Sequence, residues 1–221
     1  MTARARVAVL ASGGGSNLGA LLAHLDALGE ARGADVVLVA SDRREAGALG
    51  RARERGIAAE SLASPAEGDA LVRLLDAHGV DLVVLAGYLK LVPADVVRRF
   101  HGRMLNVHPA LLPAFGGAGM YGRRVHEAVL EAGARVSGVT VHFVSEDYDR
   151  GPIAAQWPVP VLPGDTAESL AERVLRAEHA IFPRVVQAVA AGLVRLADDG
   201  RVHGSAYVLA DAPFAPPDDT R

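Results

Sequence analysis

The sequence predicts an α/β fold with a mostly parallel twisted sheet that is covered by helices on both faces. Short apolar segments alternate along the chain with segments whose apolar residues recur at helical spacing, and such alternation produces parallel sheets. A glycine-rich turn joins the first apolar segment to the first helical one, which is typical of the N-terminal half of a Rossmann-like fold. The 221 residues suffice for one domain, which we place over residues 1–190, with a partly irregular C-terminal tail over residues 191–221.

The N-terminal half contains four predicted strands. Residues 6–10 form the first, and the glycine turn after it leads into a helix with an apolar stripe made of Leu18, Leu21, Leu22, Leu25 and Leu28. The other strands are expected over residues 35–40, 81–86 and 104–108. Helices are expected over residues 45–55, 67–78 and 93–99, the last with Pro93 as its first helical residue.

The C-terminal half is predicted to begin with a helix whose apolar residues, over 125–132, lie on one side. Alternating apolar residues over 136–144 predict a strand with two unlike faces. Residues 156–162 are expected to form a short edge strand, because Pro158 and Pro160 cannot donate ladder hydrogen bonds.

A long helix is expected to close the domain. The pattern of Thr166 and Ser169 followed by apolar residues up to Val189 predicts this helix, and a kink is expected near Pro183. From Gly192 the chain is expected to be β-rich or irregular, and to fray over residues 216–221.

Composition narrows the possible chemistry. The chain has no cysteine, which excludes disulfides, thiolate nucleophiles and cysteine-ligated zinc, and no His-Glu-x-x-His or similar spacing predicts a metal site. A net charge of −3 gives no electrostatic footprint for nucleic acid. No apolar stretch approaches the roughly 20 residues that a membrane span needs. The N-terminus lacks the apolar core of a signal peptide, so we expect a cytoplasmic location. Because the charge does not favour nucleic acid, we expect small-molecule partners.

The first candidate site is the turn Gly13-Gly14-Gly15-Ser16-Asn17 between the first strand and the first helix. Free backbone N–H groups and the dipole at a helix N-terminus attract anions, and phosphate is the natural ligand. The turn lacks the Gly-Lys-Ser/Thr of a Walker A loop and the glycine spacing of a dinucleotide loop. A tight turn that needs positive φ angles explains the glycines almost as well. Both interpretations stay open at this point.

The second candidate site is Asn106-Val107-His108-Pro109 at the carboxyl end of a predicted strand. Residues two apart in a strand project to the same face, so the amide and the imidazole would lie side by side where open α/β sheets bind ligands. Pro109 holds His108 in the extended region. A single histidine is more often structural, and that alternative stays open.

Asp149, which precedes an Arg-Gly-Pro sequence, is the candidate partner of His108. A carboxylate beside the imidazole would orient the ring and raise its pKa, which an imidazolium near neutral pH requires. Glu146 and Asp147 belong to the same acidic segment, but a solvated turn explains them better. His142 alternates with apolar residues of its strand and is expected to be a hydrogen-bonded structural histidine.

The chemistry-bearing segments follow one another along the chain as Gly13-Gly14-Gly15-Ser16-Asn17-Leu18, Leu85-Ala86-Gly87-Tyr88-Leu89-Lys90-Leu91, Asn106-Val107-His108-Pro109-Ala110-Leu111-Leu112-Pro113, His142-Phe143-Val144 with Asp149-Arg150-Gly151-Pro152, and Glu178-His179. In this order they resemble the glycinamide ribonucleotide formyltransferases of purine synthesis, over residues 6–190. The Asn, His and Asp are common to the folate formyltransferases. Taken alone, Glu178 would suggest a surface charge. Together with the glycine loop it points to the folate formyltransferase that has a nucleotide substrate.

The resemblance implies a formyltransferase fold for the catalytic domain and transfer of a formyl group from 10-formyltetrahydrofolate to the amine of glycinamide ribonucleotide. The implied catalytic residues are Asn106, His108 and Asp149. Asn106 and protonated His108 would stabilise the tetrahedral oxyanion that forms when the amine attacks the formyl carbon. Asp149 would keep His108 charged and help organise a proton-relaying water. Neither a metal nor a covalent enzyme intermediate is implied.

The resemblance also implies two groups of binding residues. The ribonucleotide would be bound by Gly15, Ser16, Asn17 and Glu178. The pterin of the folate would be bound by Leu89, Lys90, Leu91, Val92, Ser145, Glu146, Asp147 and Tyr148. We expect the protein to be a monomer or a homodimer.

Three departures from the family pattern concern binding. Lys90 replaces the usual arginine, which removes a forked donor. The segment over residues 61–69 is shorter than in many members, so an arginine that they carry there has no counterpart. Leu175 stands where relatives often have a polar residue.

Three rival functions share parts of this pattern. Methionyl-tRNA formyltransferase has the same Asn, His and Asp, but adds a basic C-terminal domain for tRNA, which the length and charge of this chain do not predict. Formyltetrahydrofolate hydrolase carries a regulatory domain before the glycine loop, whereas this loop begins near residue 12. A non-catalytic nucleotide-binding module would not need the Asn, His and Asp together.

Overall fold

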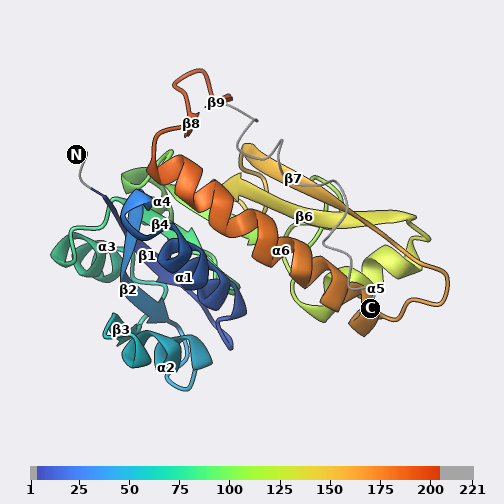
Figure 1. Ribbon diagram of the computed structural model, residues 1–221, viewed down its shortest axis with the longest axis horizontal. Coiled ribbons are helices and arrows are strands. Elements are labelled where there is room, and N and C mark those ends of the chain that lie inside the picture. The colour runs from blue at the N-terminus through green and yellow to red at the C-terminus, as the bar shows by residue number, and fades with distance from the viewer. Residues whose placement is uncertain (1–3, 205–221) are drawn as a thin grey trace.

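A seven-stranded sheet in the order β3-β2-β1-β4-β5-β6-β7 forms the centre of the computed structural model, which describes residues 4–204 (Figure 1). Strands β1 to β5 pair in parallel, and β6 and β7 are antiparallel to their neighbours. The prediction of a mostly parallel α/β sheet is confirmed. The strands are β1 Ala5–Leu10, β2 Ala34–Ser41, β3 Ala58–Ser61, β4 Leu82–Leu85, β5 Met104–His108, β6 Val136–Phe143 and β7 Ile153–Pro160.

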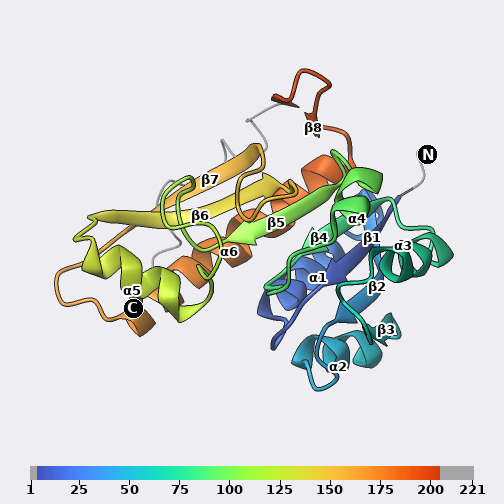
Figure 2. The ribbon, with the colours of Figure 1, turned by 180° about the vertical axis from the view of Figure 1, so that it is seen from behind.

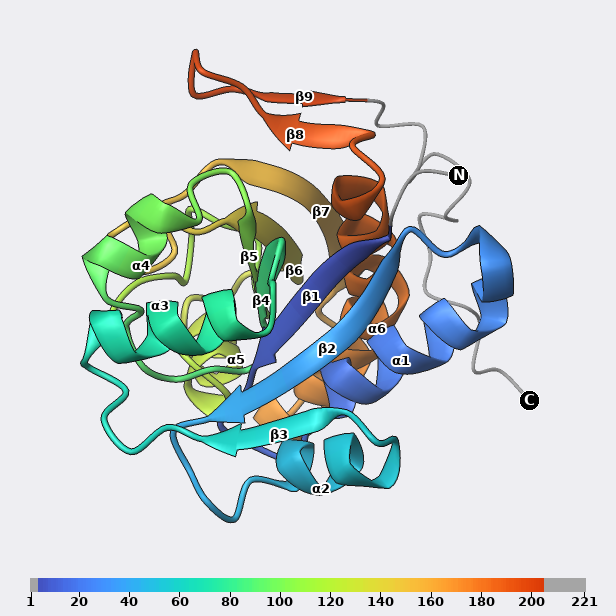
Figure 3. The same cartoon turned by 90° about the vertical axis from the view of Figure 1, so that its left-hand side faces the viewer.

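Helices cover both faces of the sheet, as the alternating pattern predicts (Figure 3). One apolar cluster joins one face to α1, α2 and α6, for example through Leu18, Leu49 and Leu170. A second cluster joins the opposite face to α3 and α4, for example through Leu71 and Val96. The helices are α1 Ser16–Leu28, α2 Gly47–Glu54, α3 Gly68–Ala77, α4 Ala94–Arg99, α5 Arg123–Glu131 and α6 Ala167–Ala190, with a short 3₁₀ helix at Gly29–Ala31.

The strand order reverses at β1, because β2 lies on one side of it and β4 on the other. Ligands of open α/β sheets bind outside the carboxyl ends of the strands at such a point. The loops that leave β1 and β4 are tied together there: the N–H of Ser12 donates to the carbonyl of Gly87 at 3.0 Å, and the N–H of Leu89 donates to Ser12 Oγ at 2.9 Å. The topology therefore indicates a site at this edge.

Helix α6 connects the two halves of the molecule (Figure 2). It begins with a capping box in which Thr166 and Ser169 exchange side-chain to backbone hydrogen bonds. Its buried face packs on α1 and also on β6 and β7. Pro183 lies inside the helix and is buried, and the expected kink at this residue stays a prediction.

Four local predictions differ from the structure. Strand β3 was not predicted, because Ala-Ala-Glu-Ser lacks both β-branched residues and apolar alternation. Strand β7 begins at Ile153 rather than at residue 156, although it is an edge strand as expected. Pro93 caps α4 instead of being its first helical residue, since its ψ of 141° is extended. The predicted helix over 45–55 begins only at Gly47.

The tail is β-rich as far as the structure describes it. Strands β8 Val194–Leu196 and β9 Val202–Gly204 form a separate antiparallel pair. The predicted fraying over residues 216–221 lies outside the described residues. Within residues 4–204, no helix combines the length and hydrophobicity required to cross a membrane.

Candidate active site

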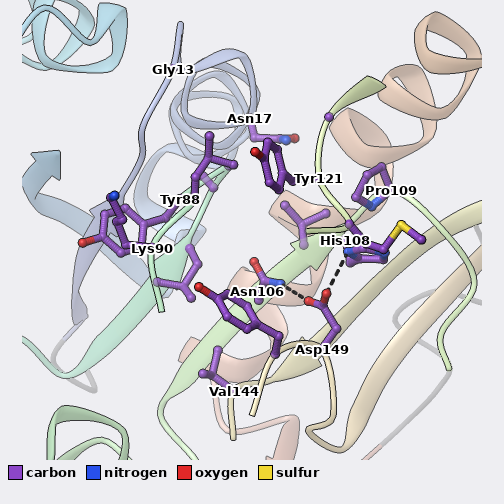
Figure 4. A pocket seen from close by; sticks show the side chains of 18 of the residues that line it. Gly13, Asn17, Tyr88, Lys90, Asn106, His108, Pro109, Tyr121, Val144 and Asp149 are labelled. Carbon is purple, nitrogen blue, oxygen red and sulfur yellow. Dashed lines mark hydrogen bonds and ion pairs between the residues drawn. The ribbon is translucent and has the colours of Figure 1, made fainter. Parts of the chain in front are cut away.

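A cavity of about 360 Å³ opens at the carboxyl ends of β1, β4 and β5 (Figure 4). It brings together segments that are far apart in the sequence. Its walls come from the β1–α1 loop, the β4–α4 loop, the end of β5, the loop before α5, the end of β6 with the loop after it, and α6. Of the predicted site residues it is lined by Gly15, Ser16, Asn17, Leu89, Lys90, Leu91, Val92, Asn106, His108, Ser145, Asp147, Tyr148, Asp149 and Glu178.

Asn106, His108 and Asp149 meet at the floor of this cavity (Figure 4). His108 Nδ1 lies 3.5 Å from Asp149 Oδ2, and Asn106 Nδ2 donates to Asp149 Oδ1 at 3.3 Å. The other ring nitrogen of His108 lies 2.8 Å from the carbonyl oxygen of Phe115. The predicted projection of residues 106 and 108 to one face is therefore observed, with the carboxylate between them.

Backbone geometry fixes the position of Asp149. Its φ of 54° lies in the left-handed region, which asparagine and aspartate adopt more readily than other residues with a side chain. Two residues later, a Cβ on Gly151 would lie 1.7 Å from the carbonyl oxygen of Phe143, so only glycine fits there. The loop can therefore fold back onto β6, and Asp149 Oδ2 accepts a hydrogen bond from the N–H of Gly117 at 2.9 Å.

Burial and nearby groups act on the pKa of His108 in opposite directions. Burial lowers the pKa of His108 below its ordinary value, although the Asp149 carboxylate and the Phe115 carbonyl both act to raise it. Asp149 thus acts on this pKa in the predicted direction, but the loss of hydration at His108, which is 3% exposed, outweighs its effect. Burial also acts to raise the pKa of Asp149, but the nearby side chains of His142 and His108 and the hydrogen bond from the N–H of Gly117 leave it below its ordinary value.

His142 belongs to the same cluster, which the sequence did not predict. It is the cross-strand partner of Asn106, and its Nε2 lies 3.0 Å from Asn106 Nδ2. Its Nδ1 lies 2.9 Å from the carbonyl oxygen of Phe143, an arrangement that favours the tautomer in which Nδ1 donates and Nε2 accepts. His142 is thus hydrogen-bonded as expected, but it also lines the cavity and accepts one of the two amide hydrogens of Asn106, while Asp149 accepts the other.

The glycine loop requires its glycines for two different reasons. Gly15 has a φ of 73°, and a Cβ there would lie 2.8 Å from Ala48 Cα, so this position fits the turn interpretation. Gly13 and Gly14 have no atom within 4 Å of an added Cβ and no positive φ. Their lack of side chains instead leaves the loop open toward the cavity. No side chain caps α1, and its first turn, Ser16 included, carries no acidic residue, so this N-terminus suits an anion.

Glu178 reaches the glycine loop from α6. Asn17 Nδ2 donates to Glu178 Oε2 at 2.6 Å, and both side chains are buried. Burial raises the pKa of Glu178, and the hydrogen bond from Asn17 opposes that increase. Asn17 Oδ1 is buried and has no hydrogen-bond partner within the described part of the chain. The pair therefore offers polar atoms beside the proposed phosphate site, as the resemblance implies.

Comparison with known proteins identifies the family. The sequence profile of the formyl transferase family matches residues 5–186. The chain belongs to the formyl transferase family. This match spans every element that contributes to the cavity, and the prediction of a formyl-transferring enzyme is confirmed.

The relatives of this formyl transferase include enzymes that are named for one particular substrate. The chain is 46% identical over 204 residues to the chloroplastic phosphoribosylglycinamide formyltransferase of Arabidopsis thaliana, an alignment that covers 89% of this chain and 69% of that protein. A crystal structure of glycinamide ribonucleotide transformylase 1 from Symbiobacterium toebii superposes with a TM-score of 0.82 at 41% identity, covering 90% of this chain and 93% of that one. A phosphoribosylglycinamide formyltransferase from Anaplasma phagocytophilum gives 0.82 at 39% identity, with the same coverage of each chain. The resemblance predicted from the motifs is confirmed.

The apolar side of the cavity of this formyl transferase lies on the predicted folate segments. Leu91 and Tyr148 are 46% and 38% exposed at its walls, and an exposed apolar surface of this kind suits a flat aromatic ligand. Glu146 is the exception. It does not line the cavity but binds Arg98 of α4 at 2.9 Å on the surface, so its predicted contact with folate has no support. The solvated-turn alternative fits Glu146 better.

Several residues of the cavity carried no assignment from the sequence. Tyr88 follows Gly87 in a segment that the family pattern contains, so its position could have been foreseen. Tyr121 lies in the loop before α5 and gave no periodic or motif signal. Of the three departures from the family, Lys90 and Leu175 line the cavity, whereas residues 61–69 do not.

Proposed function

We propose that the protein transfers the formyl group of 10-formyltetrahydrofolate to the glycinamide amine of 5-phosphoribosylglycinamide, a step of de novo purine (IMP) biosynthesis. One observation carries this proposal: a single cavity joins an anion-binding helix N-terminus to the Asn106, His108 and Asp149 cluster. The names of the relatives support the same substrate. A silent binding module would not need that cluster.

The two substrates would occupy opposite parts of the cavity. The phosphate of the ribonucleotide would bind the backbone N–H groups of Gly15, Ser16 and Asn17. Glu178 would accept hydrogen bonds from the ribose hydroxyls or the glycinamide end. The pterin of the folate would bind between Leu89, Lys90, Leu91 and Val92 on one side and Ser145, Asp147 and Tyr148 on the other.

In the proposed reaction the amine nitrogen attacks the formyl carbon, a C–N bond forms, and the carbonyl oxygen becomes an oxyanion. Asn106 would donate a hydrogen bond to this oxyanion. To do so, its amide would give up its hydrogen bond to either His142 or Asp149. Protonated His108 would supply the second donor through its Nδ1–H, which would turn from the 3.5 Å ion pair with Asp149 to the oxyanion while Nε2–H stays on the Phe115 carbonyl. Collapse of the intermediate breaks the bond to the folate nitrogen, and the proton lost by the amine passes to that nitrogen through a water organised by Asp149.

The lowered pKa of His108 is compatible with this role. In the structure its two ring nitrogens face two acceptors, the Phe115 carbonyl and the Asp149 carboxylate. Only the imidazolium can donate to both, so the geometry is built for the charged form even though burial opposes it. Asp149 would therefore hold the pKa of His108 high enough for a useful charged fraction. Binding of a negatively charged oxyanion would increase that fraction.

The remaining expectations are part of the same proposal. The proposed chemistry needs no metal ion. Small molecules are the expected partners, and a monomer or homodimer in the cytoplasm stays the prediction from the sequence.

The proposal is tested by measuring formyl transfer with two acceptors. Purified protein and 10-formyltetrahydrofolate are combined with glycinamide ribonucleotide or with the corresponding nucleoside, which lacks the phosphate. We expect the ribonucleotide to be formylated with a KM at least about tenfold lower than the KM for the nucleoside. Only the ribonucleotide carries the charged phosphate that the glycine loop would bind. Absence of transfer to the ribonucleotide would refute the proposed function.

A further inference from the structure

Arg51 of α2 contacts the outer side of the glycine loop. Its Nε donates to the carbonyl oxygen of Gly14 at 2.8 Å. Three residues earlier in the same helix, the N–H of Ala48 donates to the carbonyl oxygen of Gly13 at 3.1 Å. Helix α2 therefore binds two successive carbonyl groups of this loop.

These two hydrogen bonds determine where the loop N–H groups point. In a planar trans peptide, the carbonyl of one residue and the N–H of the next point in opposite directions. Because the carbonyls of Gly13 and Gly14 point toward α2, the N–H groups of Gly14 and Gly15 point away from it. The cavity lies on that other side, since all three glycines line it. Neither N–H has an acceptor within residues 4–204.

The contact between α2 and the loop is also tight. A Cβ on Gly47 would lie 3.1 Å from Gly14 Cα, and a Cβ on Gly15 would lie 2.8 Å from Ala48 Cα. The peptide that joins Gly14 to Gly15 thus has little freedom to rotate while Arg51 holds its carbonyl. Successive N–H groups fixed in one direction form an anion-binding concavity.

The charge of Arg51 points to an anion as well. Its Nη1 would lie 3.5 Å from a Cβ on Gly19, so the guanidinium lies beside the first turn of α1. A cation is unfavourable near a helix N-terminus, and that turn has no acidic residue to offset it. A bound anion would relieve this repulsion. The buried, unpartnered Oδ1 of Asn17 is a second, separate sign that a polar ligand completes the site.

We propose that Arg51 is a positioning residue for the phosphate of the ribonucleotide: it orients the Gly14–Gly15 peptide and supplies the nearby positive charge without lining the cavity. This inference rests on the proposed function, because it assumes that the loop binds the substrate phosphate. It assigns a specific role to α2, which acts through the loop backbone. No effect on the formyl donor is expected.

The test combines two enzyme forms with two acceptors. Arg51→Met and the wild type are assayed with glycinamide ribonucleotide and with the nucleoside that lacks the phosphate. Arg51→Met should raise the KM for the ribonucleotide about five- to tenfold, the scale for the net contribution of one ordinary hydrogen bond. Three constants should stay within about twofold of the wild type: the KM for the nucleoside, the KM for 10-formyltetrahydrofolate and kcat. This is expected because Arg51 would affect only binding of the phosphate and not the reacting atoms.

Controls separate positioning from a general effect of charge or folding. Arg53→Met removes the same charge from the same helix at an exposed position and should leave every constant unchanged. Arg51→Lys keeps a charged donor and should recover more than half of the lost affinity on a logarithmic scale. Arg51→Gln serves if the methionine variant does not fold, and the KM of the ribonucleotide should then rise by a smaller factor.

Three results would overturn the inference: an unchanged KM for the ribonucleotide in Arg51→Met, an equal rise for ribonucleotide and nucleoside, or the same rise in Arg53→Met. Failure of the proposed function itself would be visible separately, because the wild type would then not formylate the ribonucleotide at all.

Discussion

Replacement of Asp149 by asparagine removes the charge beside His108 and nearly preserves the shape of the side chain. Asparagine also adopts the left-handed region, so the φ of 54° at this position is retained. Its amide oxygen can still accept from the N–H of Gly117, and the contact given up is the longer one, from Asn106 Nδ2 at 3.3 Å. Replacement by alanine would add about 1–2 kcal/mol of backbone strain and would mix two effects.

The size of the effect follows from the distance between the two groups. Unit charges 3.5 Å apart attract by about 5 kcal/mol at an effective dielectric constant of about 20. The amide dipole retains part of this attraction, so we expect the imidazolium of His108 to lose about 3–4 kcal/mol of stabilisation. Burial already lowers the pKa of His108, so the charged fraction at neutral pH falls in proportion. Turnover by Asp149→Asn should therefore drop about 100- to 1000-fold.

The direction of the pH effect is a second consequence. Asp149 opposes the lowering of the pKa of His108, so its removal lowers that pKa further. The protonated form then persists only at lower pH, and the alkaline limit of kcat should move downward. The assay is single-turnover formyl transfer across pH, with circular dichroism to verify folding. Glu146→Gln is the matched control, because this neighbouring carboxylate binds Arg98 outside the cavity. An unchanged alkaline limit in Asp149→Asn would refute the coupling.

The other predictions concern the oxyanion donors and the glycine loop. Asn106→Ala and His108→Ala should each reduce single-turnover rates about 100-fold or more, the scale for an oxyanion donor, while the folded state survives; a near wild-type rate would make that residue structural. Ser16→Asp should raise the KM for the ribonucleotide strongly and leave folate binding nearly unchanged, because the added charge repels only the phosphate; equal weakening of both ligands would show that the phosphate is misplaced. Gly15→Ala should reduce the free energy of unfolding in urea by about 2–4 kcal/mol, from positive φ and the short contact with α2. Gly14→Ala should change stability by less than about 0.5 kcal/mol, since its Cβ meets no atom within 4 Å; similar losses in both would contradict the loop geometry.

Much of the fold could be predicted because local patterns agreed with the tertiary structure. Apolar runs and helical stripes located most elements of the parallel half, and the prolines identified β7 as an edge strand. Strand β3 was missed because a four-residue strand of small and polar residues is set by pairing with β2, which no local pattern reports. The start of β7 depends on its register with β6 for the same reason.

The site could be predicted at the level of residue types but not of contacts. Asn106 and His108 share a face of one strand, and this follows from the strand period alone. The place of His142 beside Asn106 depends on the antiparallel register between β5 and β6, which the sequence did not reveal. Asp149 raises the pKa of His108 as predicted, but the burial that outweighs this effect is a tertiary property that the sequence does not report. The folate contact predicted for Glu146 gains no support, because its neighbours in sequence line the cavity while its own side chain binds Arg98.

The central claim is that this cavity formylates the amine of glycinamide ribonucleotide, and competition among acceptors tests it most directly. The protein is given 10-formyltetrahydrofolate together with glycinamide ribonucleotide and methionyl-tRNA in water, and formyl-glycinamide ribonucleotide, formyl-methionyl-tRNA and free formate are quantified. We predict that formyl-glycinamide ribonucleotide is the dominant product, because an amine held by its phosphate gains a large proximity advantage over untethered water. Release of formate as fast as formyl-glycinamide ribonucleotide would make the protein a hydrolase, and formylation of the tRNA would contradict the account altogether.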